Sequence, residues 1–201
     1  MLDRAIQQGL RPLFARAARG LVRLGVGADA LSLAGFAIGI GAAVAIALGH
    51  FMAGLVLLLA SRAFDGLDGA VARATQPTDR GGFLDITLDF LFYAAIPLAF
   101  ALHDPATNAL PAALLLASFI GTGSSFLAFA AVAAKRGMTS VALPDKSLYF
   151  LGGLTEATET IAAFCLMCLW PAWFPVIACV FAALCGVTAV LRLWWGWQRF
   201  G

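Results

Sequence analysis

Four aspartates stand close together between apolar stretches of the sequence, and their spacing suits them for chemistry. Asp65 and Asp68 are three residues apart, and Asp85 and Asp89 are four apart, so each pair shares one face of a helix. The short connection between the two predicted helices, roughly residues 74–80, makes the helices antiparallel neighbours. We therefore expect all four carboxylates to meet at one depth.

Carboxylates gathered in this way cannot all stay ionised without protons or cations between them. Magnesium prefers oxygen ligands, and it commonly combines a few carboxylates with substrate phosphates and water. Two such ions about 3.5–4 Å apart can polarise a phosphoryl group and activate an attacking oxygen. The pattern therefore predicts a two-metal site for phosphoryl chemistry.

Two other interpretations of the aspartates stay open. The carboxylates could be structural, forming ion pairs with Arg62, Arg73 and Arg80 or capping helices. They could also bind a divalent cation as cargo, because charged residues inside membrane segments often line ion paths. A transporter predicts acids near the middle of the bilayer, on a path open to both faces, whereas these acids are expected near one interface.

The elements that position these acids must be membrane helices. The chain has 201 residues, of which 62% are hydrophobic and only 12% charged, and its mean hydropathy is +0.91. Soluble domains have about a quarter of their residues charged, and disordered chains have low hydrophobicity. At about 20 residues per crossing, the chain can hold about six spans. The composition therefore predicts an all-α integral membrane protein.

Six apolar segments follow a basic N-terminal stretch. Residues 1–25 carry five arginines on a helix that also has a hydrophobic face, which is typical of an amphipathic helix lying in the headgroup region. We expect this juxtamembrane helix to precede one six-span domain, residues 26–201. The predicted spans are residues 30–48, 52–71, 83–102, 110–134, 148–170 and 173–195.

The distribution of basic residues predicts the orientation. All 13 Lys and Arg lie in the N-terminal helix, beside the aspartates, in the fourth-to-fifth connection or at the C-terminal end, and the other three connections contain none. Because basic residues favour the cytoplasmic side, both termini and the acids are expected there, in a bacterial-type inner (plasma) membrane. Membrane lipids are then obligatory partners. Nucleic-acid binding is not expected, because the sequence has no soluble basic face with aromatic platforms.

The residues around the acids form a longer motif. It reads Asp65-x-x-Asp68-Gly69-x-x-Ala72-Arg73, then seven residues, then Gly81-x-x-x-Asp85-x-x-x-Asp89. This motif resembles the signature of the CDP-alcohol phosphotransferase family. The resemblance implies a phospholipid-synthesis enzyme that transfers a phosphatidyl group from a CDP-linked donor, CDP-diacylglycerol, to an acceptor hydroxyl and releases CMP. It also implies a homodimer.

The resemblance assigns roles to individual residues. Two divalent cations, Mg²⁺ or Mn²⁺, are implied to bind Asp65, Asp68 and Asp85, with Asp89 sharing in metal binding and acting as the general base. The CDP group of the donor is implied to contact a set drawn from three predicted helices: Asp65, Gly69, Ala72, Arg73, Gly81 and Ser32.

The sequence does not identify the acceptor alcohol. Glu156 and Glu159 lie three apart in the predicted fifth span and could bind an amine or a polyol, or pair with Arg136, Lys146 or Arg192. Lys135 and Arg136, with Lys146, could instead hold a phosphorylated acceptor, or could be ordinary positive charge on the cytoplasmic side. Both alternatives remain open.

Overall fold

The computed structural model describes residues 2–138 and 154–201 and contains only helices over these ranges. In chain order the elements are α1 (Leu2–Arg23), α2 (Ala28–Ala47), α3 (Phe51–Ala74), α4 (Asp79–His103), α5 (Pro105–Lys135), α6 (Ala157–Leu169), the 3-10 turn η1 (Pro171–Trp173) and α7 (Phe174–Phe200). The prediction of an all-α membrane protein is confirmed.

Four of the described helical segments are long and apolar enough to cross a bilayer: α2, α4, α5 and the continuous segment formed by η1 and α7. The helix α3 has 24 residues but carries the charged motif, and the described part of α6 has 13 residues. The predicted fifth span begins at residue 148, and its first part lies outside the described residues. The count of six spans therefore stays a prediction.

Local capping decides where two helices begin. Thr78 caps α4, since its hydroxyl oxygen accepts a hydrogen bond from the backbone N–H of Gly81 at 3.0 Å. The expected connection, 74–80, is accordingly only 75–78. Asp104 caps α5 in the same way, and Pro105 follows at the first helical position, where proline is tolerated. The helix α5 therefore begins five residues before the predicted span.

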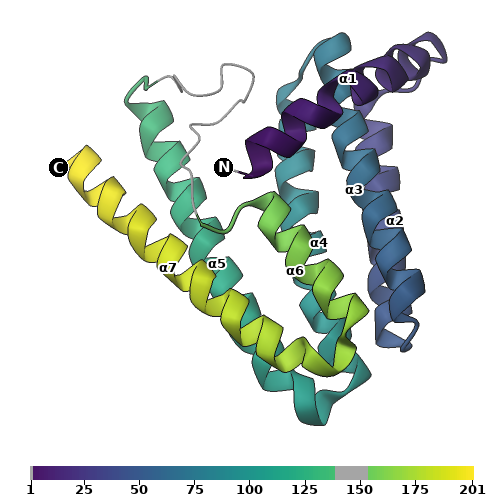
Figure 1. The fold of residues 1–201 in the computed structure, drawn as a ribbon. Helices are drawn as coiled ribbons and strands as arrows, with labels where there is room; N and C mark the ends of the chain where they lie inside the picture. Colours follow the sequence, from purple (N-terminus) through teal and green to yellow (C-terminus); the bar gives the residue numbers. More distant parts are fainter. Residues whose placement is uncertain (1, 139–153) are drawn as a thin grey trace.

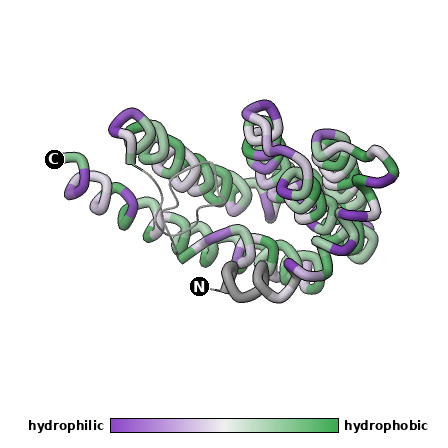
Figure 2. Tube along the Cα trace, turned by 90° about the horizontal axis from the view of Figure 1, so that it is seen from above, coloured by the Kyte–Doolittle hydropathy of each residue, from purple (hydrophilic) through white to green (hydrophobic). Residues whose placement is uncertain are grey.

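The helices pack as two groups joined through α4. Helices α2 and α3 form one side of the bundle, α5 and α7 form the other, and α4 and α6 lie between them (Figure 1). Seen from the end of the bundle, hydrophobic residues cover most of the helices, and the hydrophilic stretches are short (Figure 2). This pattern fits helices that face lipid as well as one another.

The helix α1 runs across one end of the bundle and packs against α3 (Figure 1). Its apolar face holds Phe14, the fully buried Ala18 and Leu21. Its arginines at positions 11, 16, 19 and 23 are exposed. The helix is thus amphipathic as predicted, whereas its location at the membrane interface stays a prediction.

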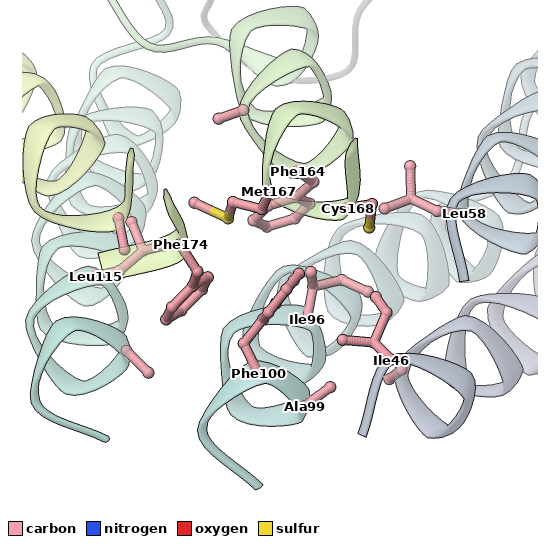
Figure 3. Packing of buried hydrophobic residues seen from close by; sticks show 14 of the residues in the cluster. Ile46, Leu58, Ile96, Ala99, Phe100, Leu115, Phe164, Met167, Cys168 and Phe174 are labelled. Atoms are coloured by element: carbon pink, nitrogen blue, oxygen red, sulfur yellow. The ribbon is translucent and has the colours of Figure 1, made fainter. Parts of the chain in front are cut away.

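Aromatic side chains fill the centre of the bundle. Phe100 of α4 stacks on Phe174 of α7 with ring centroids 4.5 Å apart, and Phe164 of α6 meets Phe92 of α4 edge to face at 6.3 Å. Figure 3 shows these helices converging around Ile96, Phe164 and Met167. All four cysteines are free thiols, and Cys168 belongs to this core. The core holds α4 in place, and α4 carries two of the four aspartates.

Candidate active site

Three of the four aspartates form a compact cluster. Asp65 and Asp68 on α3 and Asp85 on α4 place one carboxylate oxygen each so that all three oxygens lie within 4.8 Å of one another. Asp68 is only 6% exposed. The three side chains therefore offer a hard oxygen donor set of the kind that divalent cations bind.

Asp89 lies one turn further along α4 and is held differently. Its Oδ1 accepts a hydrogen bond from Nη1 of Arg62 at 2.6 Å. The same Arg62 nitrogen lies 3.5 Å from Oδ1 of Asp65. The expected ion pairing of the acids with arginine is thus found at Arg62. Arg80 instead pairs with Asp29 of α2 at 2.5 Å.

A small pocket joins these groups. It is lined by side chains from three helices, namely Ser32, Gly35 and Phe36 of α2, Arg62, Asp65 and Asp68 of α3, and Asp85, Leu88 and Asp89 of α4. All four predicted acids therefore face one cavity. Its free volume of about 10 Å³ is close to that needed for one water molecule, so a nucleotide would have to bind outside the cavity.

Close helix packing brings α2 against the acids. A Cβ on Gly35 would lie 2.9 Å from Phe64 Cβ, and a Cβ on Gly39 would lie 2.7 Å from the Phe92 ring. The hydroxyl of Ser61 donates to the carbonyl oxygen of Gly35 at 2.7 Å. The missing side chains let the backbones approach, and this approach places α2 in the wall of the pocket.

The hydroxyl of Ser32 contacts an acid of the cluster directly. Ser32 Oγ lies 2.5 Å from Asp68 Oδ2 and 3.2 Å from the carbonyl oxygen of Ala28. The resemblance implied that Ser32 contacts the CDP group, and that contact stays a prediction. The bond to Asp68 was not predicted, because no sequence spacing relates residues on different helices.

The other residues implied to bind CDP lie at the exposed end of the same two helices. Gly69, Ala72 and Arg73 follow Asp68 along α3, and the Arg73 guanidinium lies over Gly69, where a Cβ would be 3.2 Å from Nη1. Gly81 lies in the first turn of α4, where a Cβ would be 3.4 Å from an Asp29 oxygen. We call these four residues the rim, because they flank the acid cluster on the same two helices; the Arg73 side chain lies beside Gly69, and the Thr78 and Asp29 side chains lie beside Gly81.

The described residues considered for the acceptor do not line the acidic pocket. Glu156 and Glu159 form a capping box at the start of α6, in which the Glu156 backbone N–H donates to Glu159 Oε2 at 3.1 Å. Arg136 donates to the Phe200 carbonyl oxygen at 2.7 Å. Lys135 is exposed at the end of α5. Lys146 lies outside the described residues.

The all-helical bundle and the acid cluster shared by α3 and α4 suit metal-dependent chemistry on phosphoryl groups at a membrane. The model of the CDP-alcohol phosphatidyltransferase family matches residues 26–194. The chain therefore belongs to that family, and it is an enzyme. The transporter interpretation of the acids receives no support from this membership.

Two relatives are similar to the chain in sequence. The chain is 53% identical to inner membrane protein YnjF of Escherichia coli over 197 residues, covering 98% of this chain and 96% of that protein. It is 47% identical over 70 residues to the archaetidylinositol phosphate synthase of Methanothermobacter thermautotrophicus, covering 34% of this chain and 36% of that enzyme.

Its fold is similar to that of phosphatidylinositol phosphate synthase from Mycobacterium tuberculosis. The structure of that enzyme with CDP-DAG bound has a TM-score of 0.74 at 23% identity and covers 92% of this chain and 94% of that chain. Its complex with manganese and citrate has a TM-score of 0.72 at 22% identity and covers 92% and 88%.

Proposed function

We propose that this protein transfers the phosphatidyl group of CDP-diacylglycerol to the hydroxyl group of an acceptor and releases CMP. The observation that carries the proposal is the pocket in which Asp65, Asp68, Asp85 and Asp89 meet beneath a rim of small residues and Arg73. A water-soluble CDP head can reach such a rim while the acyl chains of the donor stay in lipid. Support for this donor comes from the similarly folded enzyme that was solved with CDP-DAG bound.

We propose that the acids bind two divalent cations, Mg²⁺ or Mn²⁺. Asp65, Asp68 and Asp85 would hold them, since their oxygens lie within 4.8 Å of one another, and Asp89 on the same pocket wall would share in binding. Bound cations would neutralise the donor diphosphate and polarise the phosphorus that is attacked. Manganese in a similarly folded enzyme supports this assignment.

Asp89 is the proposed general base. Its carboxylate removes the proton of the acceptor hydroxyl as the acceptor oxygen bonds to the phosphorus attached to diacylglycerol, and the bond from that phosphorus to the CMP oxygen breaks. CMP leaves with the electron pair of that bond, and Asp89 later gives the proton to solvent. Positioning and charge compensation supply most of the rate enhancement in phosphoryl transfer, so the residues that align the donor matter as much as the base.

The rim residues would align the CDP group. Gly69 and Gly81 have no side chain, so the phosphates can approach the backbone, and the Ala72 methyl group is small. Arg73 can bind a phosphate through two nitrogens at once. Asp65 and Ser32 line the pocket itself and would contact the ribose and phosphates of the donor.

The acceptor, the orientation and the assembly are further parts of the proposal. Glu156 and Glu159, or alternatively Lys135 and Arg136, would contact the acceptor. The active site and both termini would face the cytoplasm, with α1 lying along the headgroups, in a six-span homodimer. The basic residues on the cytoplasmic side of the predicted topology support this orientation.

The experiment uses purified protein reconstituted in lipid with labelled CDP-diacylglycerol. Serine, glycerol phosphate, inositol phosphate, choline and a second lipid are offered in turn, and CMP release is measured with Mg²⁺, with Mn²⁺ and after chelation. We expect metal-dependent CMP release with one acceptor and its loss in Asp89→Asn. Asp104→Asn is the matched control, because Asn also caps helices and Asp104 lies outside the pocket. Full activity of Asp89→Asn would refute the assigned base.

A further inference from the structure

Arg62 is a buried cation at the centre of the acidic pocket, and neither the family motif nor the mechanism above gives it a role. Its side chain is 14% exposed. Nη1 contacts Asp89 at 2.6 Å and Asp65 at 3.5 Å, while Nη2 donates to Ser61 Oγ at 3.2 Å. Two acids, Asp65 of α3 and Asp89 of α4, therefore meet this one arginine.

An aromatic ring fixes the guanidinium in a second direction. Cζ of Arg62 lies 4.0 Å from the centroid of the Phe92 ring, a distance at which a cation is attracted to the face of an aromatic ring. Phe92 is fully buried and follows Asp89 by three residues on α4, so both residues present the same helix face to α3. The Arg62 guanidinium is thereby held between the Phe92 ring and the Asp89 carboxylate.

This arrangement is costly to maintain. The buried Nε of Arg62 has no acceptor in the described structure, and a buried N–H without an acceptor destabilises the folded state. Charged residues within membrane helices are also expensive and mark functional positions by default. A residue that only joined α3 to α4 could be apolar, so the charge itself must be useful.

The contacts divide the four acids into two sets. Asp65, Asp68 and Asp85 share the cluster with oxygens within 4.8 Å, while Asp89 is bound through Oδ1 to the guanidinium. A charge-assisted hydrogen bond of this kind fixes both the direction and the rotamer of a carboxylate. It leaves Oδ2 of Asp89 as the oxygen that can accept a proton.

We propose that Arg62 is a positioning residue that holds one oxygen of Asp89, so that the other oxygen is oriented to accept the proton of the acceptor hydroxyl. The inference rests on the proposed function, because it presupposes Asp89 as the base. Arg62 acts through Asp89 and does not touch the donor. It should therefore affect turnover much more than donor binding.

The kinetic test compares Arg62→Lys and Arg62→Gln with Arg199→Gln, which removes the same charge from an exposed position at the C-terminal end of α7. Loss of a residue that orients a ligand typically costs about 10- to 100-fold in activity. We expect Arg62→Gln to lower kcat by such a factor with the KM for CDP-diacylglycerol unchanged, Arg62→Lys to recover part of kcat, and the control to match wild type. A raised donor KM at normal kcat would overturn the inference.

Combining Arg62→Gln with Asp89→Asn tests whether the two residues act together. If Arg62 acts through Asp89, the double variant releases CMP at the same residual rate as Asp89→Asn. An additional loss equal to that of Arg62→Gln alone would show independent action and overturn the proposal.

A stability cycle on the chelated protein checks the contact without any reaction. Removing one partner of a buried ion pair leaves the other charge uncompensated. The thermal midpoint of the double variant should therefore fall by less than the sum of the decreases in the two single variants. A decrease equal to that sum would contradict the pairing of Arg62 with Asp89. If wild type and Arg62→Gln release CMP at the same rate, the role of Arg62 is refuted and the proposed function stands. If wild type releases no CMP, both the proposed function and the role of Arg62 are refuted.

Discussion

The hydrogen bond from Ser32 to Asp68 gives a quantitative test of how the acid cluster is held. Ser32 Oγ lies 2.5 Å from an oxygen of Asp68, whose side chain is buried. Ser32→Ala removes the donor and preserves the helix, because alanine is the best helix former. A hydrogen bond to a charged group contributes about 1.5–3 kcal/mol. At about 1.4 kcal/mol per factor of ten, we expect metal binding to weaken by at least about tenfold.

The assay measures metal and donor separately. Free Mn²⁺ is titrated by electron paramagnetic resonance, and the metal concentration that gives half-maximal CMP release is determined alongside the donor KM at saturating metal. Ser32→Ala should raise the Mn²⁺ dissociation constant and the half-maximal metal concentration by at least about tenfold, whereas loss of the proposed donor contact alone would raise only the donor KM. Ser32→Thr keeps the hydroxyl and serves as the control. Unchanged Mn²⁺ binding with a raised donor KM would refute the reasoning and indicate a nucleotide contact instead.

Three further perturbations test the packing and the caps. Gly35→Ala places a Cβ 2.9 Å from an α3 side-chain atom, so we expect the free energy of unfolding to fall by about 1–3 kcal/mol, with a lower thermal midpoint in detergent. Gly186→Ala is the control: a Cβ there meets nothing within 4 Å, and its thermal midpoint should equal or exceed that of wild type. Gly66→Ala places a Cβ 2.7 Å from an aromatic ring of α1 and should loosen that helix, seen as faster tryptic cleavage at its arginines; an unchanged cleavage rate would contradict the contact. Hydrogen bonding from Thr107 lowers the pKa of Asp104 below its ordinary value, so the stabilisation by the ionised carboxylate is present at neutral pH and is lost as the pH falls through the lowered pKa. The thermal midpoints of wild type and Asp104→Ala should therefore differ at neutral pH and converge in acid; a difference that does not change with pH would exclude the carboxylate as its source.

The convergence of the acids could be predicted because it follows from helical geometry. Spacings of three and four residues put each pair on one face of its helix. The short connection returns the chain so that the two faces meet through side chains, although α3 and α4 both pack mainly against α2. The structure places Asp65, Asp68 and Asp85 in one cluster and Asp89 in the same pocket. Which acid pairs with Arg62 could not be predicted, because four carboxylates compete for one guanidinium and only the packing of α4 decides among them.

Contacts between residues far apart in the sequence could not be predicted either. The bond between Ser32 and Asp68 spans 36 positions, and it depends on how closely α2 approaches α3. The capping box of Glu156 and Glu159 was missed for a different reason. A continuous apolar span was expected from residue 148, so the two acids were placed inside a helix rather than at the beginning of α6.

The packing of α1 has a practical consequence for anyone who shortens the chain. Phe14 of α1 lies directly over Gly66, which sits between Asp65 and Asp68, and Ala18 closes the adjoining apolar surface around Val71. A truncated protein that starts at α2 would keep the four aspartates of the pocket but lose the wall behind them. Water and lipid would then reach the face of α3 that α1 now covers, so such a fragment should not be used as a minimal domain.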